Sequence, residues 1–245
     1  ISPLNLLDGL GDVNIELRDF SARGNIGTPG ATVNDPDIKI DWTIQTDAFV
    51  ASMNSVSGTA DQQVNGTLDI AIGGGIDLEV PNVVLAVGTF TLSTSTADVT
   101  DGTISISNAQ VLIFTLSNVS IFAGIGAGFV NTTDPFTNGA AEVIDTTGAT
   151  GFSLTNGGLQ LAIVQDPAVN GATYSAIAVT ADQATLLGLP DTFIFEITDL
   201  AFGANNGYVA PTAPAGTAPI KLDWSNLTID PTGDLGLPAL IATFD

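Results

Sequence analysis

"FEITDLAF" at residues 195–202 contains the pattern that decides the fold class of this 245-residue chain. Its apolar residues alternate with polar ones, at odd positions before Asp199 and at even positions after it. Alternation with a period of two is typical of a β-strand with one apolar face. A regular strand cannot change phase without turning its apolar side chains to the other face. The phrase therefore predicts a bulge, a bend or a corner at the aspartate, a residue type that tolerates the left-handed backbone conformation.

The same phrase recurs along the chain, with an Asn or Asp at the change of phase. Val, Ile, Thr and Phe are abundant, Gly and Asn punctuate the phrases, and no segment has a convincing helical period. These features predict an all-β protein, either an elongated β-solenoid or an extended β-sandwich. A corner in the middle of each phrase favours the solenoid, because its coils need one. The further copies lie at 15–22, 104–111, 114–121, 152–161 and 222–229.

A much longer repeat is also present. Residues 13–25 match 193–205 at an offset of 180, and "IKIDW" at 38–42 matches "IKLDW" at 220–224 at an offset of 182. The second pair contains both tryptophans and both lysines of the chain. Two residues are added in the intervening loop, where insertions are tolerated, so the matches predict a tandem array. The predicted boundaries are 1–37 for the end of one unit, 38–219 for a full unit of about 182 residues, and 220–245 for the start of the next.

The composition excludes several classes of function. The net charge is −22, so binding to nucleic acid or to an anionic membrane surface is not expected. The chain has no Cys and no His, which removes the usual ligands of zinc, copper, haem and iron–sulfur clusters and excludes Ser–His and Cys–His catalysis. No apolar run approaches the roughly 20 residues of a membrane-spanning helix. The charge instead favours a saline or calcium-rich medium, in which cations screen the acidic groups.

Acid-rich turns are the candidate metal sites. Calcium binds carboxylate, amide and backbone oxygens of tight loops, and the charge of the chain makes calcium the expected cofactor. The alternative for each turn is that Asp and Asn accept hydrogen bonds from nearby backbone N–H groups and so build the turn itself. The candidate ligands are Asn34, Asp35, Asp37, Asp98, Asp101, Asn131 and Asp134.

Two further sets of residues have alternative interpretations. Trp42 and Trp224 would suit stacking against glycans, but both lie on the apolar side of an alternating segment, which favours the core. The carboxylates Glu16 and Asp19, repeated at Glu196 and Asp199, resemble the acid pair of a glycoside hydrolase. Each pair spans a change of phase and recurs in tandem, so a structural role is favoured and no enzymatic activity is expected.

Three phrases within residues 120–202 suggest a family: "FAGIG", "TTGATGFSLTN" and "YSAIAVTADQATLLGLP". They resemble long repeats of very large secreted bacterial surface proteins, the adhesin-like giants that often open with a LEPR-XLL segment. The resemblance implies an extracellular or cell-surface location and repeats strung along an exported protein. It carries over no catalytic residue.

The expected function is a structural or adhesive repeat module of a bacterial fibre, sheath or surface protein. Its partners would be neighbouring units, docked end to end, with calcium bridging acidic surfaces and surface glycans as a further ligand. One alternative is a β module that binds glycans or apolar ligands. Another is a polysaccharide-active β-helix enzyme.

Overall fold

The computed structural model describes ten stretches of the chain. Within them the protein is all-β, as predicted, and its only helical elements are short 3-10 turns. No helix in the described stretches is long and apolar enough to cross a membrane. The stretches are residues 13–27, 39–41, 64, 66–130, 142–168, 171–190, 194–210, 217–230, 237–239 and 241–244.

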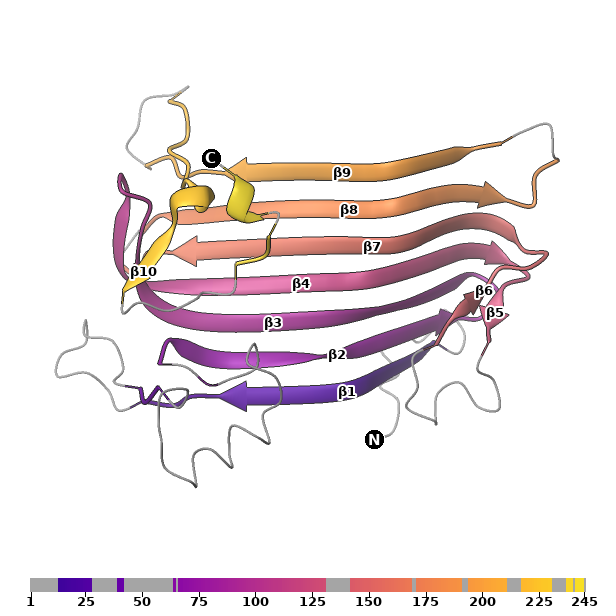
Figure 1. Cartoon of the computed structure of the whole chain (residues 1–245), viewed down its shortest axis with the longest axis horizontal. Coiled ribbons are helices and arrows are strands. Elements are labelled where there is room, and N and C mark those ends of the chain that lie inside the picture. Colours follow the sequence, from indigo (N-terminus) through magenta and orange to yellow (C-terminus); the bar gives the residue numbers. More distant parts are fainter. Residues whose placement is uncertain are drawn as a thin grey trace.

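Seven long strands form one antiparallel sheet in which each strand pairs with the next along the chain (Figure 1). β1 and β9 are therefore its two edges, and the described part of the sheet is a meander rather than a stack of coils. The strands are β1 (Asn14–Gly24), β2 (Leu68–Val80), β3 (Val84–Thr100), β4 (Ser105–Ile125), β7 (Thr150–Gln165), β8 (Thr173–Leu187) and β9 (Glu196–Asn206).

Smaller elements lie at the two ends of the long strands. β5 (Gly128–Phe129) and β6 (Ile144–Asp145) pair with each other near one end. The C-terminal segment lies near the other end (Figure 1). It contains the 3-10 turns η2 (Trp224–Asn226) and η3 (Ile241–Thr243), and β10 (Thr228–Asp230), which pairs with the end of β3.

Within the long strands, the Asn and Asp residues of the recurring phrase have a left-handed backbone, and a register shift marks a bulge at each of them except Asp199. The backbone φ angle is positive at five of them: Asp19 (49°), Asn108 (53°), Asn118 (53°), Asn156 (50°) and Asp199 (54°). β4 passes through two of these residues without leaving the sheet, so they are not corners. Of the three predicted possibilities, the bulge is the one observed.

The pairing of β3 with β4 shows what a bulge does. Ser117 of β4 lies opposite Thr89, and Ser120 lies opposite Val87, so one extra residue is absorbed at Asn118. Odd-numbered residues of β3 therefore lie opposite odd-numbered residues of β4 at Ser117, and opposite even-numbered residues at Ser120. The change of phase in the sequence keeps the apolar pattern on one face of the sheet.

The phrase at 222–229 folds differently. Its Asn226 ends the η2 turn and is not in a strand. The Asp223 carboxylate accepts hydrogen bonds from the backbone N–H groups of Ser225 (3.0 Å) and Asn226 (3.2 Å), and this caps the turn. Of the bulge, bend or corner predicted at this position, the chain forms a turn and not a bulge, because the side chain at position 223 competes for the backbone donors. The strand predicted before Asn226 is absent, and β10 begins after the turn at Thr228.

The face of the sheet that carries the odd positions of β3 is covered at both ends, and we call it the covered face. The C-terminal segment packs on one end with Leu222, Trp224 and Ile241 fully buried. The β5–β6 hairpin packs on the other, where Phe129 meets Leu85 and Phe122. The sheet residues beneath the C-terminal segment are Ala97, Val99, Ile106, Ala109, Val111, Ile113, Ala162, Val164, Tyr174, Ala176 and Ala178.

The opposite face carries the even positions of β3, including Phe90 and Leu92, and we call it the open face. Its large apolar side chains belong to neither buried cluster. At the margins they are strongly exposed, as at Leu17 (55 %), Ile70 (56 %) and Phe202 (60 %). No second sheet covers this face among the described residues, so they form one layer with caps on one side only.

Candidate functional site

The two edges of the sheet are built from matching sequences. β1 lies within 13–25, and β9 lies within 193–205 except for its last residue, Asn206, so the strands at opposite edges are counterparts (Figure 1). Asp19 and Asp199 are left-handed at equivalent positions. The β1 bulge lies in its pairing with β2, between Arg18 and Ser21. By contrast, β9 pairs with β8 in continuous register past Asp199, so this pairing contains no bulge.

An asparagine ties each edge strand to the segment that follows it. The Asn25 side-chain amide donates to the Ile40 carbonyl at 2.9 Å. Its counterpart Asn205 donates to the Leu222 carbonyl at 3.1 Å. Ile40 and Leu222 occupy the same position in "IKIDW" and "IKLDW". The two copies therefore make the same contact at opposite edges of the sheet.

The two lysines differ in their partners. Lys39 forms an ion pair with Asp69 at the start of β2 and also approaches the Thr67 carbonyl at 3.4 Å. Its counterpart Lys221 is exposed and forms no ion pair with any residue that the structure describes. Lys39 thus contacts β2, the strand that pairs with edge strand β1. Lys221 presents its charge to solvent.

Trp224 lies in the core and not on a binding surface. It is 1 % exposed, and its indole N–H donates to the Asn205 side-chain oxygen at 3.1 Å. Its ring faces therefore offer no platform for a glycan. Trp42 lies outside the described residues.

The described members of the proposed calcium set organise turns. The Asp98 carboxylate accepts from the backbone N–H of Asn108 at 2.6 Å, beside the bulge. Asp101 accepts from the N–H groups of Thr103 (2.8 Å), Ile104 (2.7 Å) and Asp223 (3.0 Å). Burial alone would raise the pKa of Asp101, but these donors outweigh it and lower the pKa.

The contacts of Asp101 correspond to the turn-building alternative, whereas Asp98 lies in β3 and binds the backbone at the bulge of β4. The described stretches contain no group of three or more acidic side chains that could hold a metal ion. The other five candidate ligands lie outside those stretches: Asn34, Asp35, Asp37, Asn131 and Asp134.

The two copies of the carboxylate pair considered for glycoside hydrolysis do not combine into one site. Glu16 lies on β1 and Glu196 on β9, at opposite edges of the sheet. Six inter-strand spacings of about 4.8 Å separate those edges by roughly 29 Å. The two carboxyl groups of a glycosidase lie about 5 to 10 Å apart. Within each copy, Asp19 lies at the β1 bulge and Asp199 has the same left-handed backbone.

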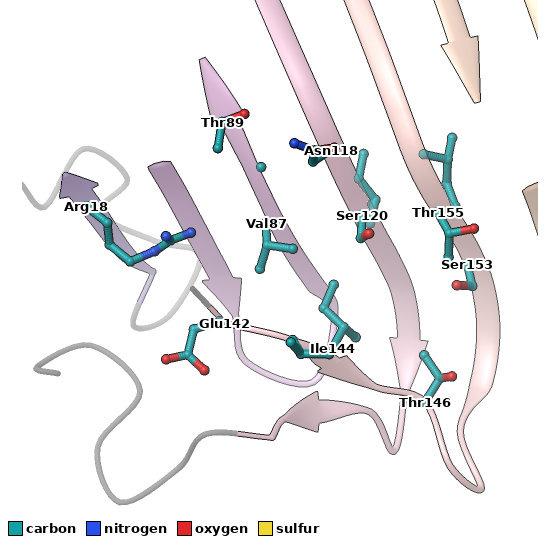
Figure 2. A pocket seen from close by; sticks show the side chains of 14 residues that line it. Arg18, Val87, Thr89, Asn118, Ser120, Glu142, Ile144, Thr146, Ser153 and Thr155 are labelled. Atoms are coloured by element: carbon teal, nitrogen blue, oxygen red, sulfur yellow. The ribbon is translucent and has the colours of Figure 1, made fainter. Parts of the chain in front are cut away.

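A cavity of about 470 Å³ with polar and apolar lining lies between the covered face and the β5–β6 hairpin (Figure 2). Arg18 of β1 and the buried Glu142 stand on one side of it, with hydroxyl groups from β3, β4 and β7 around them. Among the described residues that line it, Glu142 is the only carboxylate. The hydroxyl-bearing residues that line it are Thr89, Ser120, Thr146, Ser153 and Thr155.

Arg18 forms a buried ion pair that sequence reasoning missed. Its guanidinium donates two hydrogen bonds to Asp77 of β2, one of them from Nη2 at 2.8 Å. Asp77 is completely buried, and the bond to it raises the pKa of Arg18 against the effect of burial. A Cβ atom at Gly75 would lie 2.7 Å from the Arg18 Nη1 atom, so this glycine makes room for the guanidinium. The signal in the sequence was an arginine within a strand phrase together with a triple glycine in the next strand.

Comparison with protein-family models, curated protein sequences and solved structures finds no match to this chain. The features of the chain that bear on function are those of the sheet: two edges with matching sequences, one capped face and one exposed apolar face.

Proposed function

We propose that this chain is a structural repeat module of a long extracellular bacterial fibre, sheath or adhesin-like surface protein. The observation that carries the proposal is that β1 and β9, counterparts in sequence, form the opposite edges of one sheet. In this proposal β9 is the first strand of the next unit. Each unit then contributes six long strands, β1 to β4, β7 and β8, and the sheet continues from unit to unit.

Hydrogen bonding at the sheet edge is the docking mechanism in this proposal. An edge strand presents unpaired N–H and C=O groups that form a template for another strand. The counterpart of β2 in the next unit would pair with the free edge of β9, as β2 pairs with β1. That strand would accommodate the Asp199 bulge, and its aspartate equivalent to Asp69 would pair with Lys221.

The remaining properties suit a structural role. Carboxylates spread along the chain keep a long assembly hydrated and discourage non-specific association. Calcium would bridge acidic surfaces of neighbouring units, and a lower unfolding midpoint in EDTA would support this part of the proposal. Of the two architectures predicted from the sequence, the extended sandwich is the better supported, because a sheet with one exposed apolar face needs a second layer.

A binding module is the second candidate. The exposed apolar side chains of the open face favour it, since a patch of this kind marks an interaction site. In that case the ligand would be apolar rather than a glycan stacked on Trp224, whose ring is buried.

The proposal is tested on an engineered tandem chain, in which residues 13–192 are followed directly by residues 13–245. Small-angle X-ray scattering should show one particle elongated along the inter-strand direction, and unfolding should be a single transition. Scattering that fits two independently moving units joined by a flexible linker would contradict the proposal. The single 245-residue chain is the matched control for shape and cooperativity.

A further inference from the structure

The open face is a continuous apolar surface across the central strands. The pairing register places Leu116 of β4 opposite Phe90 of β3 and Leu159 of β7. Leu159 in turn lies opposite Val179 of β8, and Val179 lies opposite Phe202 of β9. The other large side chains that the register places on this face are Ile72, Ile76, Leu92, Leu112, Phe114, Leu161, Ile163 and Ile177.

The chemistry of this face is unusual for a chain with a net charge of −22. β4 and β7, which run through its middle, contain no charged residue over their whole length. β3 and β8 each contain one, Asp98 and Asp182. These four central strands therefore contribute almost no charge to the open face.

The size of the face exceeds what a monomer normally exposes. Seven strands about 4.8 Å apart, with roughly eleven residues of about 3.3 Å each, cover about 1,000 Å². The largest apolar patch on a typical monomeric protein is about 300–600 Å². A stable protein–protein interface takes about 800 Å² from each partner. The open face is large enough to form such an interface alone.

We propose that the open face packs against the open face of a second copy of this chain, forming a two-layer β-sandwich with the covered faces outside. A second copy is the occupant because its sheet has the same strand spacing and twist, which aligned sheet packing about 10 Å apart requires. The covered face is already occupied at both ends, by the C-terminal segment and by the β5–β6 hairpin.

This inference goes beyond the proposed function, which concerns the edges. An array of identical units would supply the second copy at high effective concentration. Face-to-face pairing does not require the array, because two separate copies of the 245-residue chain can also pair. The charge of the two copies opposes association, and salt screens that repulsion. Dimer formation is therefore expected to strengthen as the ionic strength rises.

The first test is sedimentation equilibrium of the 245-residue chain and two variants. The unaltered chain should be a dimer. Leu161→Glu places a carboxylate at the centre of the open face and should raise the dimer dissociation constant at least about a hundredfold, because the charge would be buried without a partner. The matched control Thr91→Glu, at an exposed residue of the covered face, should leave the constant unchanged.

The second test uses the absence of cysteine from the chain. Single substitutions Leu116→Cys and Leu161→Cys should give cross-linked dimers on mild oxidation, and Thr91→Cys should not. Cross-links confined to Thr91→Cys would overturn the inference, because they would place the partner on the covered face.

Three further outcomes would also overturn it. An unaltered chain that stays monomeric while Leu161→Glu lowers its unfolding midpoint sharply would show that a segment of the same chain covers the face. Binding to phosphatidylcholine vesicles without dimerisation would identify a lipid surface as the occupant. A dimer indifferent to Leu161→Glu would assign association to the strand edges, as in the proposed function. Conversely, failure of the engineered tandem chain with an intact face-dependent dimer would reject the proposed function alone.

Discussion

The backbone of Asn118 lies at a φ of 53°, a conformation that an L-amino acid with a branched side chain rarely adopts. Opposite it, a Cβ atom on Gly88 would lie 3.2 Å from the Val119 side chain, a tight contact, so a small residue in β3 suits the bulge. Local sequence was enough to predict an irregular backbone where an Asn or Asp coincides with the change of phase. Both the alternation and the backbone preference of these residue types are local properties. At Asn226 the same local pattern gives a turn and not a bulge, because the neighbouring Asp223 carboxylate accepts hydrogen bonds from the backbone N–H groups.

Substitution at Asn118 tests the left-handed bulge. Asn118→Val should lower the free energy of unfolding by about 1–2 kcal/mol, because a residue with a Cβ branch is strained in this conformation. Asn118→Gly is the control and should stay within about 0.5 kcal/mol of the unaltered chain. Urea denaturation measures both values, and equal stability of the two variants would contradict the account.

The buried ion pair between Arg18 and Asp77 gives a second prediction at this scale. Asp77→Ala should destabilise the chain by about 3 kcal/mol or more, because it leaves a buried guanidinium without its partner. The double substitution Arg18→Met and Asp77→Leu should recover most of that loss, since apolar groups of similar volume need no partner. If the double variant were as unstable as the single one, the loss would come from packing and not from the charge.

The lowered pKa of Asp101 predicts a dependence of stability on pH. Its carboxylate is more acidic in the folded than in the unfolded chain, so its contribution is fully present above the unfolded value of about 3.9. The contribution is lost as the pH falls through the lower folded value. The stability difference between the unaltered chain and Asp101→Asn should therefore be constant near neutrality and shrink below about pH 4. A difference that does not change with pH would mean that the carboxylate charge is not involved.

At the scale of elements, periodicity predicted the existence of strands far better than their pairing. The alternation in "FSLTNGGLQL" and in the counterparts 13–25 and 193–205 identified strands that are present in the sheet. The capping roles of the β5–β6 hairpin and of the C-terminal segment had no local signature. Their positions depend on which apolar positions of the sheet they bury, and that follows from register between distant residues.

The C-terminal segment docks through a glycine of β9. A Cβ atom at Gly203 would lie 2.6 Å from the Phe244 ring, so Gly203→Val should displace this segment from the sheet. The expected result is faster amide hydrogen exchange at Leu222 and Trp224. Ala201→Val, two residues away on the same strand, is the control and should leave exchange there unchanged. Unaltered exchange in Gly203→Val would show that the contact does not hold the segment.

At the scale of the whole molecule, composition and repeats indicated an acidic, all-β tandem unit but favoured a solenoid of stacked coils. The described sheet is an antiparallel meander with an exposed apolar face. Alternation in a sequence shows that a strand has an apolar side, and it contains no information on what covers that side. The choice between coil and sandwich depends on strand pairing and on what covers that side, and alternation specifies neither.

The central claim is that one sheet passes through successive units, with β9 taking the place of β1. It is tested most directly by hydrogen exchange on the engineered tandem chain described above, at residues 14–24 of its second copy, which link the two units. If the sheet is continuous, these amides gain hydrogen-bond partners on both sides and should exchange as slowly as those of an interior strand such as β4. Exchange as fast as that of the edge strand β9 in the single chain would contradict the claim.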